Sequence, residues 1–404
     1  MRAAPARPRG TLATMSTRLS LLLVPLIAAL LSGCSTGVRP AGQGAAPAST
    51  GLSGHLLIIG GGLDDDNKPV YERFITLASP NGQTPRIVIA TAASGDQEAN
   101  AVGKTESIRA YCPAAKIDVI RRETPTDETV GLIDQATAMF FTGGDQKRII
   151  DRYRPSGIDT PEAAAMRRLL ERSGVIAGTS AGDAMMSDPM FHTGRSAEAL
   201  GIRSTRTQRG EDDDADDKRP QPPLGPQIGP GMNLIPWVIT DSHFFERHRF
   251  GRLVAALETG GKRLGLGVGE DACAEVNLAT GERTGISIAD SLLVDIGAIK
   301  REGLARRDVR AKVIQQGTRV SLTGLLAQPV ASLAAPALPA AVAEEIPVVE
   351  PGQNRQLASW RFFTRAQIPG TAPQSLKLDG YNQIGWPDGQ GWSMVEITPQ
   401  VRKP

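Results

Sequence analysis

The feature that most constrains this chain is an alternation of short apolar runs with longer amphipathic stretches, which begins at His55. Each apolar run is bounded by small residues and is apolar nearly throughout, as a strand buried on both faces should be. The runs cover 56–59, 87–90, 117–120, 138–141, 175–177 and 238–240, and helical stretches between them cover 98–111, 146–153, 160–172 and 247–259. The pattern therefore predicts an α/β fold with an open, doubly wound, mostly parallel sheet.

The second half of the chain changes character after residue 264. Short β-like runs at 264–269, 272–276, 291–296 and 319–322 either complete the sheet or extend it at one edge. We therefore expect a main domain over 55–327 with a β-rich C-terminal part. The segment 328–352, rich in Ala, Pro, Val and Glu, is typical of a linker. Residues 353–404 carry three of the four tryptophans, so this extension of unknown role should fold or dock on the core.

The N-terminus has the pattern of an export signal. Four arginines precede an apolar run over 19–31 that is too short for a comfortable membrane span. Residues 31–34, Leu-Ser-Gly-Cys, resemble a bacterial lipobox, which predicts a signal peptide over 1–34 and a lipid anchor on Cys34. An ordinary signal peptide is the alternative. Residues 35–54 are too polar and small to fold, and indicate a flexible tether. The expected protein is exported and membrane-anchored, with the outer membrane favoured by Ser35.

Charge and cysteine content exclude some functions. The formal charge of +2 sets 45 basic against 43 acidic residues, which is not the basic field that non-specific nucleic-acid binding needs. Cys112 and Cys273 lack metal-ligand spacing. We expect no nucleic-acid partner, no metal and no organic cofactor.

Three segments follow strands and carry chemistry. In the first, Gly-Thr-Ser-Ala-Gly at 178–182, a tight strand-to-helix turn would project the Ser180 hydroxyl above the sheet. Glycines around a serine can also merely close a turn, so the neighbouring segments decide. In the second, 140–146, backbone amides of Gly144 and Ala181 would form an oxyanion hole. Gln146 would then contact substrate.

The third segment, 241–252, supplies a general base and cationic side chains. The chain has four histidines, and His243 is favoured because it stands at a strand end, with His192 and His248 as rivals. Three arginines within six residues would bind carboxylates. The alternative is a solvated helix face. The residues concerned are Asp241, Arg247, Arg249 and Arg252.

Together these three segments resemble those of the cyanophycinases and their α-aspartyl dipeptidase relatives, over roughly residues 55–325. The resemblance implies a fold related to class I glutamine amidotransferases, Ser180 as nucleophile, His243 as base and an acid that orients the imidazole. By distance from the serine, Glu198 is the expected acid, with Glu270 and Asp188 as rivals.

The resemblance also implies a substrate. Cyanophycinases cleave a polyaspartate carrying arginine on each β-carboxyl group, which releases β-Asp-Arg dipeptides. Gln146, Asp241 and the three arginines would line the pocket for this arginylated acidic polymer. Ser242 departs from the family's glutamine before the histidine, which puts strict specificity in doubt. A homodimer is left open.

Other readings remain at this point. A dipeptidase or esterase of the same fold would use the arginines for another carboxylate, and an inactive exported binding protein would only capture ligand. The acidic run 211–217 is typical of a solvated loop, with attraction of an arginine-rich polymer or a cation as the alternatives.

Overall fold

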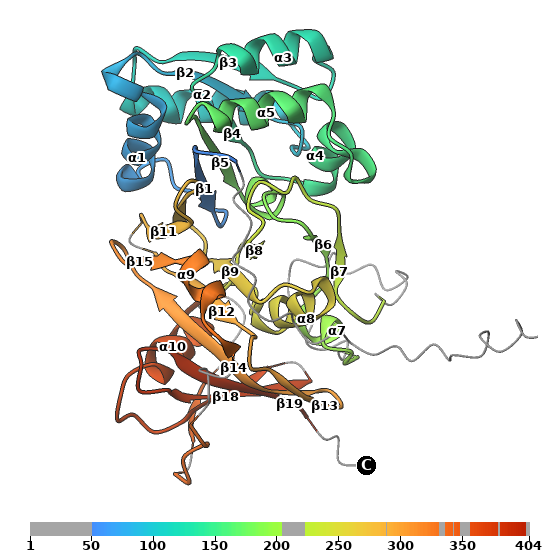
Figure 1. Ribbon diagram of the computed structural model, residues 1–404, viewed down its shortest axis with the longest axis vertical. Helices are drawn as coiled ribbons and strands as arrows, with labels where there is room; N and C mark the ends of the chain where they lie inside the picture. The colour runs from blue at the N-terminus through green and yellow to red at the C-terminus, as the bar shows by residue number, and fades with distance from the viewer. Residues whose placement is uncertain are drawn as a thin grey trace, which may run out of the picture. The chain divides into compact units, whose positions relative to one another are not determined.

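The computed structural model describes residues 51–203, 223–287, 289–330, 336–341, 343–347, 356–378 and 380–400, and these lie in one compact unit. Cys34 and the acidic run 211–217 lie outside the described residues. The predicted α/β class is confirmed by an eight-stranded sheet in the order β15-β11-β10-β1-β5-β4-β2-β3 (Figure 1). Its parallel strands are β1 (His55–Ile59), β5 (Val175–Thr179), β4 (Ala138–Phe141), β2 (Arg86–Ala90) and β3 (Lys116–Ile120). Three antiparallel strands extend it: β10 (Cys273–Asn277), β11 (Glu282–Gly285) and β15 (Arg319–Ser321).

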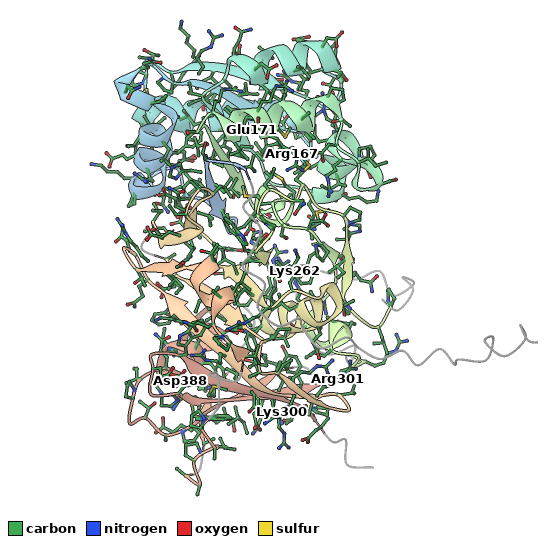
Figure 2. All side chains as sticks on the ribbon, viewed as in Figure 1. Arg167, Glu171, Lys262, Lys300, Arg301 and Asp388 are labelled. Atoms are coloured by element: carbon green, nitrogen blue, oxygen red, sulfur yellow. The ribbon has the colours of Figure 1, made fainter. Side chains whose placement is uncertain are left out.

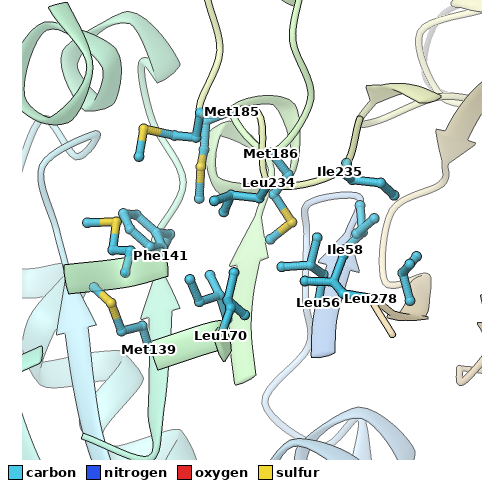
Figure 3. Close-up of a cluster of buried hydrophobic side chains, with 14 of the residues drawn as sticks. Leu56, Ile58, Met139, Phe141, Leu170, Met185, Met186, Leu234, Ile235 and Leu278 are labelled. Atoms are coloured by element: carbon cyan, nitrogen blue, oxygen red, sulfur yellow. The ribbon is translucent and has the colours of Figure 1, made fainter. Parts of the chain in front are cut away.

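Helices cover both faces of this sheet, as the doubly wound prediction requires. On one face, Leu57 and Ile59 of β1 share a buried cluster with Phe74. On the other face, the alternate residues Leu56 and Ile58 belong to a second cluster with Leu170, as Figure 3 shows. The helices concerned are α1 (Lys68–Ala78), α2 (Gln97–Tyr111), α3 (Thr126–Gln135), α4 (Gln146–Tyr153) and α5 (Pro161–Glu171), with the 3-10 turns η1 (Pro80–Gly82) and η2 (Pro155–Gly157).

A second sheet, mostly antiparallel, follows along the chain in the order β16-β17-β18-β19-β14-β12-β9-β8. The run at 238–240 is indeed a strand, β8 (Val238–Asp241), but it pairs with β9 (Leu264–Val268) here and not with the parallel sheet. An apolar run indicates a buried strand without indicating its neighbour. The other strands of the catalytic part are β12 (Ser291–Asp295), β13 (Lys300–Glu302) and β14 (Ala305–Ile314), and β6 (Met190–Thr193) pairs separately with β7 (Gln227–Gly229).

The C-terminal extension continues the second sheet. Its elements are α10 (Gln356–Ala366), β17 (Gln374–Leu378), β18 (Tyr381–Pro387) and β19 (Ser393–Pro399). Within the expected linker, β16 (Glu344–Ile346) pairs with β17, and α9 (Leu322–Ala327) precedes it. Strand β19 pairs with β14, and Asp388, labelled in Figure 2, accepts a 3.0 Å hydrogen bond from Arg310 of β14.

Three short helices lie around the catalytic segments: α6 (Ala181–Ala184), α7 (Ser196–Ala199) and α8 (Phe250–Gly260). Helix α8 begins three residues after the predicted start at 247, because His248 adopts a left-handed φ of 49° that a helix does not tolerate. In the ranges that the structure describes, no helix is long and apolar enough to span a bilayer.

Candidate active site

The nucleophile turn has the predicted strand-to-helix form. Ser180 follows β5 with φ 54° and ψ −103°, a strained conformation, and its N–H donates to the carbonyl of Ile59 (2.9 Å). Glycine is required on both sides, since a Cβ on Gly178 would lie 2.3 Å from the oxygen of Gly182, and one on Gly182 would lie 2.8 Å from Phe141 Cβ. The buried core therefore holds the strained turn in place.

The base lies directly opposite this serine. His243 follows β8 and its Nε2 is 2.8 Å from Ser180 Oγ, while its Nδ1 is 2.6 Å from Glu270 Oε1. The backbone holds the ring, because the N–H of His243 donates to Gly60 and a Cβ on Gly61 would lie 2.3 Å from the ring carbon Cε1. This arrangement is a Ser-His-Glu triad.

The expected acid, Glu198, is corrected to Glu270. Both ring nitrogens of His243 are already engaged, one by the serine and one by Glu270, so no position on the imidazole is left for another carboxylate. Glu198 is buried in α7, and the rival Asp188 pairs instead with Arg154 at 2.8 Å. Distance along the chain from the nucleophile was a poor guide, because Glu270 reaches the ring from the turn after β9.

The loop 60–62 was not predicted as part of the site. It consists of three consecutive glycines directly after β1, and each approaches the triad or its supporting turn. Gly61 packs under the imidazole, while Gly62 would place a Cβ 3.3 Å from Glu270 Cβ. The signal was visible in the sequence as a glycine triplet at the carboxyl end of a strand, where backbone must pass close to another group.

Burial and neighbouring charges set the protonation of the base. Burial lowers the pKa of His243, the Glu270 carboxylate opposes this, and Arg247 and Arg249 lower it further. The hydrogen bond from His243 holds the pKa of Glu270 below its ordinary value. A neutral imidazole that donates from Nδ1 to the carboxylate therefore leaves Nε2 free to accept the serine proton.

The glycine pair of the second segment lies beside the nucleophile. A Cβ on Gly143 would be 3.4 Å from Ser180 Cβ. Gly144 has φ 136° and passes so close to Ala93 that a Cβ would lie 2.2 Å from its carbonyl oxygen, so only glycine fits. Ala181 is the first residue of α6. The loop and the start of the helix therefore lie near Ser180. That their backbone amides form an oxyanion hole stays a prediction.

Gln146 has a supporting contact in the structure. Its Nε2 donates to the carbonyls of Phe191 and His192 (2.8 and 2.9 Å), which ties α4 to β6. These bonds fix the orientation of the side-chain amide. Contact between Gln146 and substrate stays a prediction.

The predicted cluster of substrate-binding charges divides into two groups. Asp241 and Arg252 are 1% and 5% exposed, and Arg252 Nε lies 2.8 Å from Asp241 Oδ2. Arg252 also donates to Gly194 and stacks over Phe191 at 4.5 Å. The structure therefore places Asp241 and Arg252 in an internal ion pair, and their contact with substrate stays a prediction.

The other two arginines differ in exposure, since Arg249 is largely enclosed and Arg247 is exposed. Arg249 donates to the carbonyl of Ser242 (2.6 Å) and to Asp241 (3.3 Å), and burial lowers its pKa to about 9. Arg247 is exposed, and its charge acts on both His243 and Glu270. Arg247 is therefore the arginine of this segment best placed to meet a substrate carboxylate.

A separate polar cavity of about 460 Å³ lies at the other end of β1, away from the triad. It is lined in part by His55, Arg73 and Glu275, and Arg73 forms two bonds to Glu275 (2.6 and 2.7 Å). Against the effect of burial, the hydrogen bond from His55 (2.9 Å) together with those from Arg73 holds the pKa of Glu275 to about 2. Among the described residues no group of three His, Cys, Asp or Glu is placed to hold a metal ion.

Comparisons with known proteins return cyanophycinases. The cyanophycinase of Geminocystis herdmanii is 31% identical over 230 residues, which are 55% of this chain and 74% of the relative. That of Nostoc sp. is 32% identical over 167 residues (40% and 47%), and that of Synechococcus elongatus is 26% identical over 231 residues (56% and 63%). The matched region thus spans less than two thirds of the second and third relatives.

No protein-family model matches the chain. A solved structure described as a peptidase from an acI-B1 Actinobacterium has a TM-score of 0.46 at 17% identity, and covers 67% of this chain and 97% of that one.

Proposed function

This chain belongs to the cyanophycinase family of serine peptidases, and we propose that it hydrolyses aspartyl peptide bonds through an acyl-enzyme on Ser180. One observation carries the proposal: the hydrogen-bonded row from Ser180 Oγ through His243 to Glu270, at 2.8 and 2.6 Å. These distances suit proton transfer between nucleophile and base.

The reaction follows from the positions of these atoms. His243 Nε2 accepts the proton of Ser180 as Oγ attacks the scissile carbonyl, and Glu270 stabilises the imidazolium that forms. The tetrahedral oxyanion lies toward the loop of Gly144 and the first amide of α6. The imidazolium then gives its proton to the leaving amine, which breaks the peptide bond. A water molecule, deprotonated by the same imidazole, hydrolyses the serine ester and restores the enzyme.

For the substrate, we propose cyanophycin, the arginylated polyaspartate, cleaved to β-Asp-Arg dipeptides. The support is the relatives' activity together with the exposed Arg247 beside the triad, whose guanidinium suits an aspartyl carboxylate. Ser242 does not offer a side-chain amide, and it is buried against Arg249. An aspartyl dipeptidase or an esterase that reads a different carboxylate is therefore the second candidate.

The test compares wild type with Ser180→Ala on three substrates: cyanophycin, Asp-X dipeptides and a simple ester. We expect wild type to release β-Asp-Arg from the polymer, and Ser180→Ala to lose both turnover and labelling by a serine-directed fluorophosphonate. Turnover of dipeptides alone would support the second candidate. Absence of labelling in wild type would instead favour an inactive binding protein.

We also propose that the enzyme acts outside the cytoplasm, anchored through lipid on Cys34, which would bring it to polymer released from other cells. The basis is the lipobox-like run at 31–34. Mass spectrometry of the mature N-terminus should find a diacylated cysteine, absent from Cys34→Ala. An unmodified mature N-terminus at another residue would refute the anchor without touching the peptidase proposal.

A further inference from the structure

We propose that helix α10 of the C-terminal extension is a positioning element of the catalytic centre, acting through Ser359 and Trp360. The inference rests on the proposed serine-peptidase function. It assigns a role to a part of the chain whose sequence predicted none.

Trp360 acts on the turn that carries the acid. Its Nε1 donates to Asp290 Oδ2 at 2.7 Å, and the indole is 36% exposed. The carbonyl of Asp290 accepts the N–H of Gly269 (3.4 Å), and a Cβ on Gly269 would lie 3.1 Å from that oxygen. Gly269 immediately precedes Glu270. The indole of Trp360 thus holds Asp290 in place, and the turn that carries Glu270 packs against Asp290.

Ser359 acts on the turn that carries the base. Its Oγ is 2.5 Å from His248 Nδ1, and His248 has φ 49°. A second hydroxyl, Ser196 Oγ, donates to the carbonyl of the same histidine (2.7 Å). The segment from His243 to Arg249 is irregular, so such bonds must supply the restraint that a helix or strand would supply itself.

Aromatic packing joins the two contacts. Phe363 of α10 lies 4.9 Å from Phe250 and 6.5 Å from Phe245, measured between ring centroids. Phe245 in turn reaches Gly269, where a Cβ would lie 3.0 Å from its Cδ2. The base's turn is therefore sandwiched between α10 on one side and the acid's turn on the other.

This arrangement explains how two strained turns hold a triad. His243 itself has φ 45°. A non-glycine residue keeps such a left-handed conformation only when many surrounding contacts hold it there. Displacements on the order of 1 Å between catalytic groups cost about 100-fold in rate. Loosening α10 should therefore reduce the rate of chemistry at Ser180 while leaving the binding of substrate nearly unchanged.

The experiment is a double-mutant cycle in the full chain with Trp360→Phe and Asp290→Ala. Trp360→Phe keeps an aromatic ring and removes the N–H donor, whereas Asp290→Ala removes the acceptor. We expect each variant to lower kcat and the fluorophosphonate labelling rate by about 10- to 100-fold with KM within about twofold. The double variant should be no worse than either single one, because both changes remove the same bond.

The pH profile separates positioning from a general loss of structure. Glu270 raises the pKa of His243, so a loosened Glu270 should move the acidic limb of kcat/KM to lower pH. Ser359→Ala should lower kcat in the same way through the base's turn. Thr364→Ala is the matched control, because among the described residues the Thr364 hydroxyl bonds carbonyls of its own helix, those of Trp360 and Arg361.

Three results would overturn the inference: wild-type labelling rates in Trp360→Phe and Ser359→Ala, an unchanged acidic limb, or a change in KM alone. Should Trp360→Phe fold poorly, Asp290→Ala and Ser359→Ala test the same inference. If wild type itself fails to label, the peptidase proposal fails, which is a different outcome.

Discussion

At the residue scale, the catalytic centre depends on a carboxylate that lies far along the chain from its serine. Glu270 reaches His243 because the turns after β8 and β9 are adjacent, and these two strands pair in parallel. The carboxyl ends of such strands meet at one edge of the sheet. The residue that orients His243 therefore comes from the turn after the strand next to β8 in the sheet, not from a fixed distance along the chain.

Replacing Glu270 by glutamine should expose this dependence. The amide keeps the shape of the side chain but no longer favours the tautomer with the proton on Nδ1, and comparable changes in other triads lower kcat by about 10⁴-fold. Steady-state kinetics with Glu198→Gln as the matched control would check it. Glu198→Gln should stay close to wild type, and the reverse order of effects would restore Glu198 as the acid.

The acidic limb of the pH profile is a second residue-scale prediction. Burial and the two nearby arginines lower the pKa of His243, so the base should stay neutral, and the enzyme active, below the ordinary histidine value of about 6.5. Arg247→Gln removes one cation that favours the neutral ring. The acidic limb should then move to higher pH. Arg319→Gln, which changes an exposed arginine far from the triad, is the control and should leave the limb in place. A shift to lower pH would contradict the electrostatic account.

At the scale of elements, the joint between β8 and α8 is a buried ion pair. Arg252 is held by Asp241 and by the carbonyl of Gly194, and nearly no solvent reaches the pair. Removal of one partner leaves a charge uncompensated in the interior.

We therefore expect Arg252→Met to lower the free energy of unfolding by about 3–5 kcal/mol. The exposed Arg247→Gln should change it by less than about 0.5 kcal/mol and should raise KM instead. Urea denaturation and steady-state kinetics of both variants would measure this contrast. An Arg252→Met protein of normal stability with a raised KM would place Arg252 in the substrate pocket.

How much of this was predictable differs between elements. Strands β1, β2, β4 and β5 were predicted from apolar runs and helix α4 from an amphipathic stretch, because a strand buried on both faces has a strong local signature. The serine turn and His243 were predicted from glycine spacing and strand ends. The strands of the second sheet in the catalytic part were expected, but their pairing into a separate sheet was not, and Glu270 was named only as a rival acid. Pairing partners and the left-handed His248 depend on contacts distant in sequence.

At the scale of the whole described molecule, the extension is bound to the catalytic part through shared strands. Strand β14 pairs with β12 on one edge and with β19 on the other. Arg310 of β14 both pairs with Asp388 and lies 4.6 Å from the ring of Trp392. Phe363 belongs to the same buried cluster as Phe250, so one core extends from α8 into α10.

A core shared in this way should unfold as one unit. Three of the four tryptophans lie in the extension, so intrinsic fluorescence reports mostly on it, whereas far-UV circular dichroism is dominated by the helices of the catalytic part. We expect the two signals to give coincident urea transitions, and Phe363→Ala to shift both midpoints together, with a loss of about 3–5 kcal/mol. An early fluorescence transition with unchanged dichroism would mean that the extension unfolds alone. Such independence would also contradict a positioning role for α10, since a helix that detaches freely cannot hold the catalytic turns.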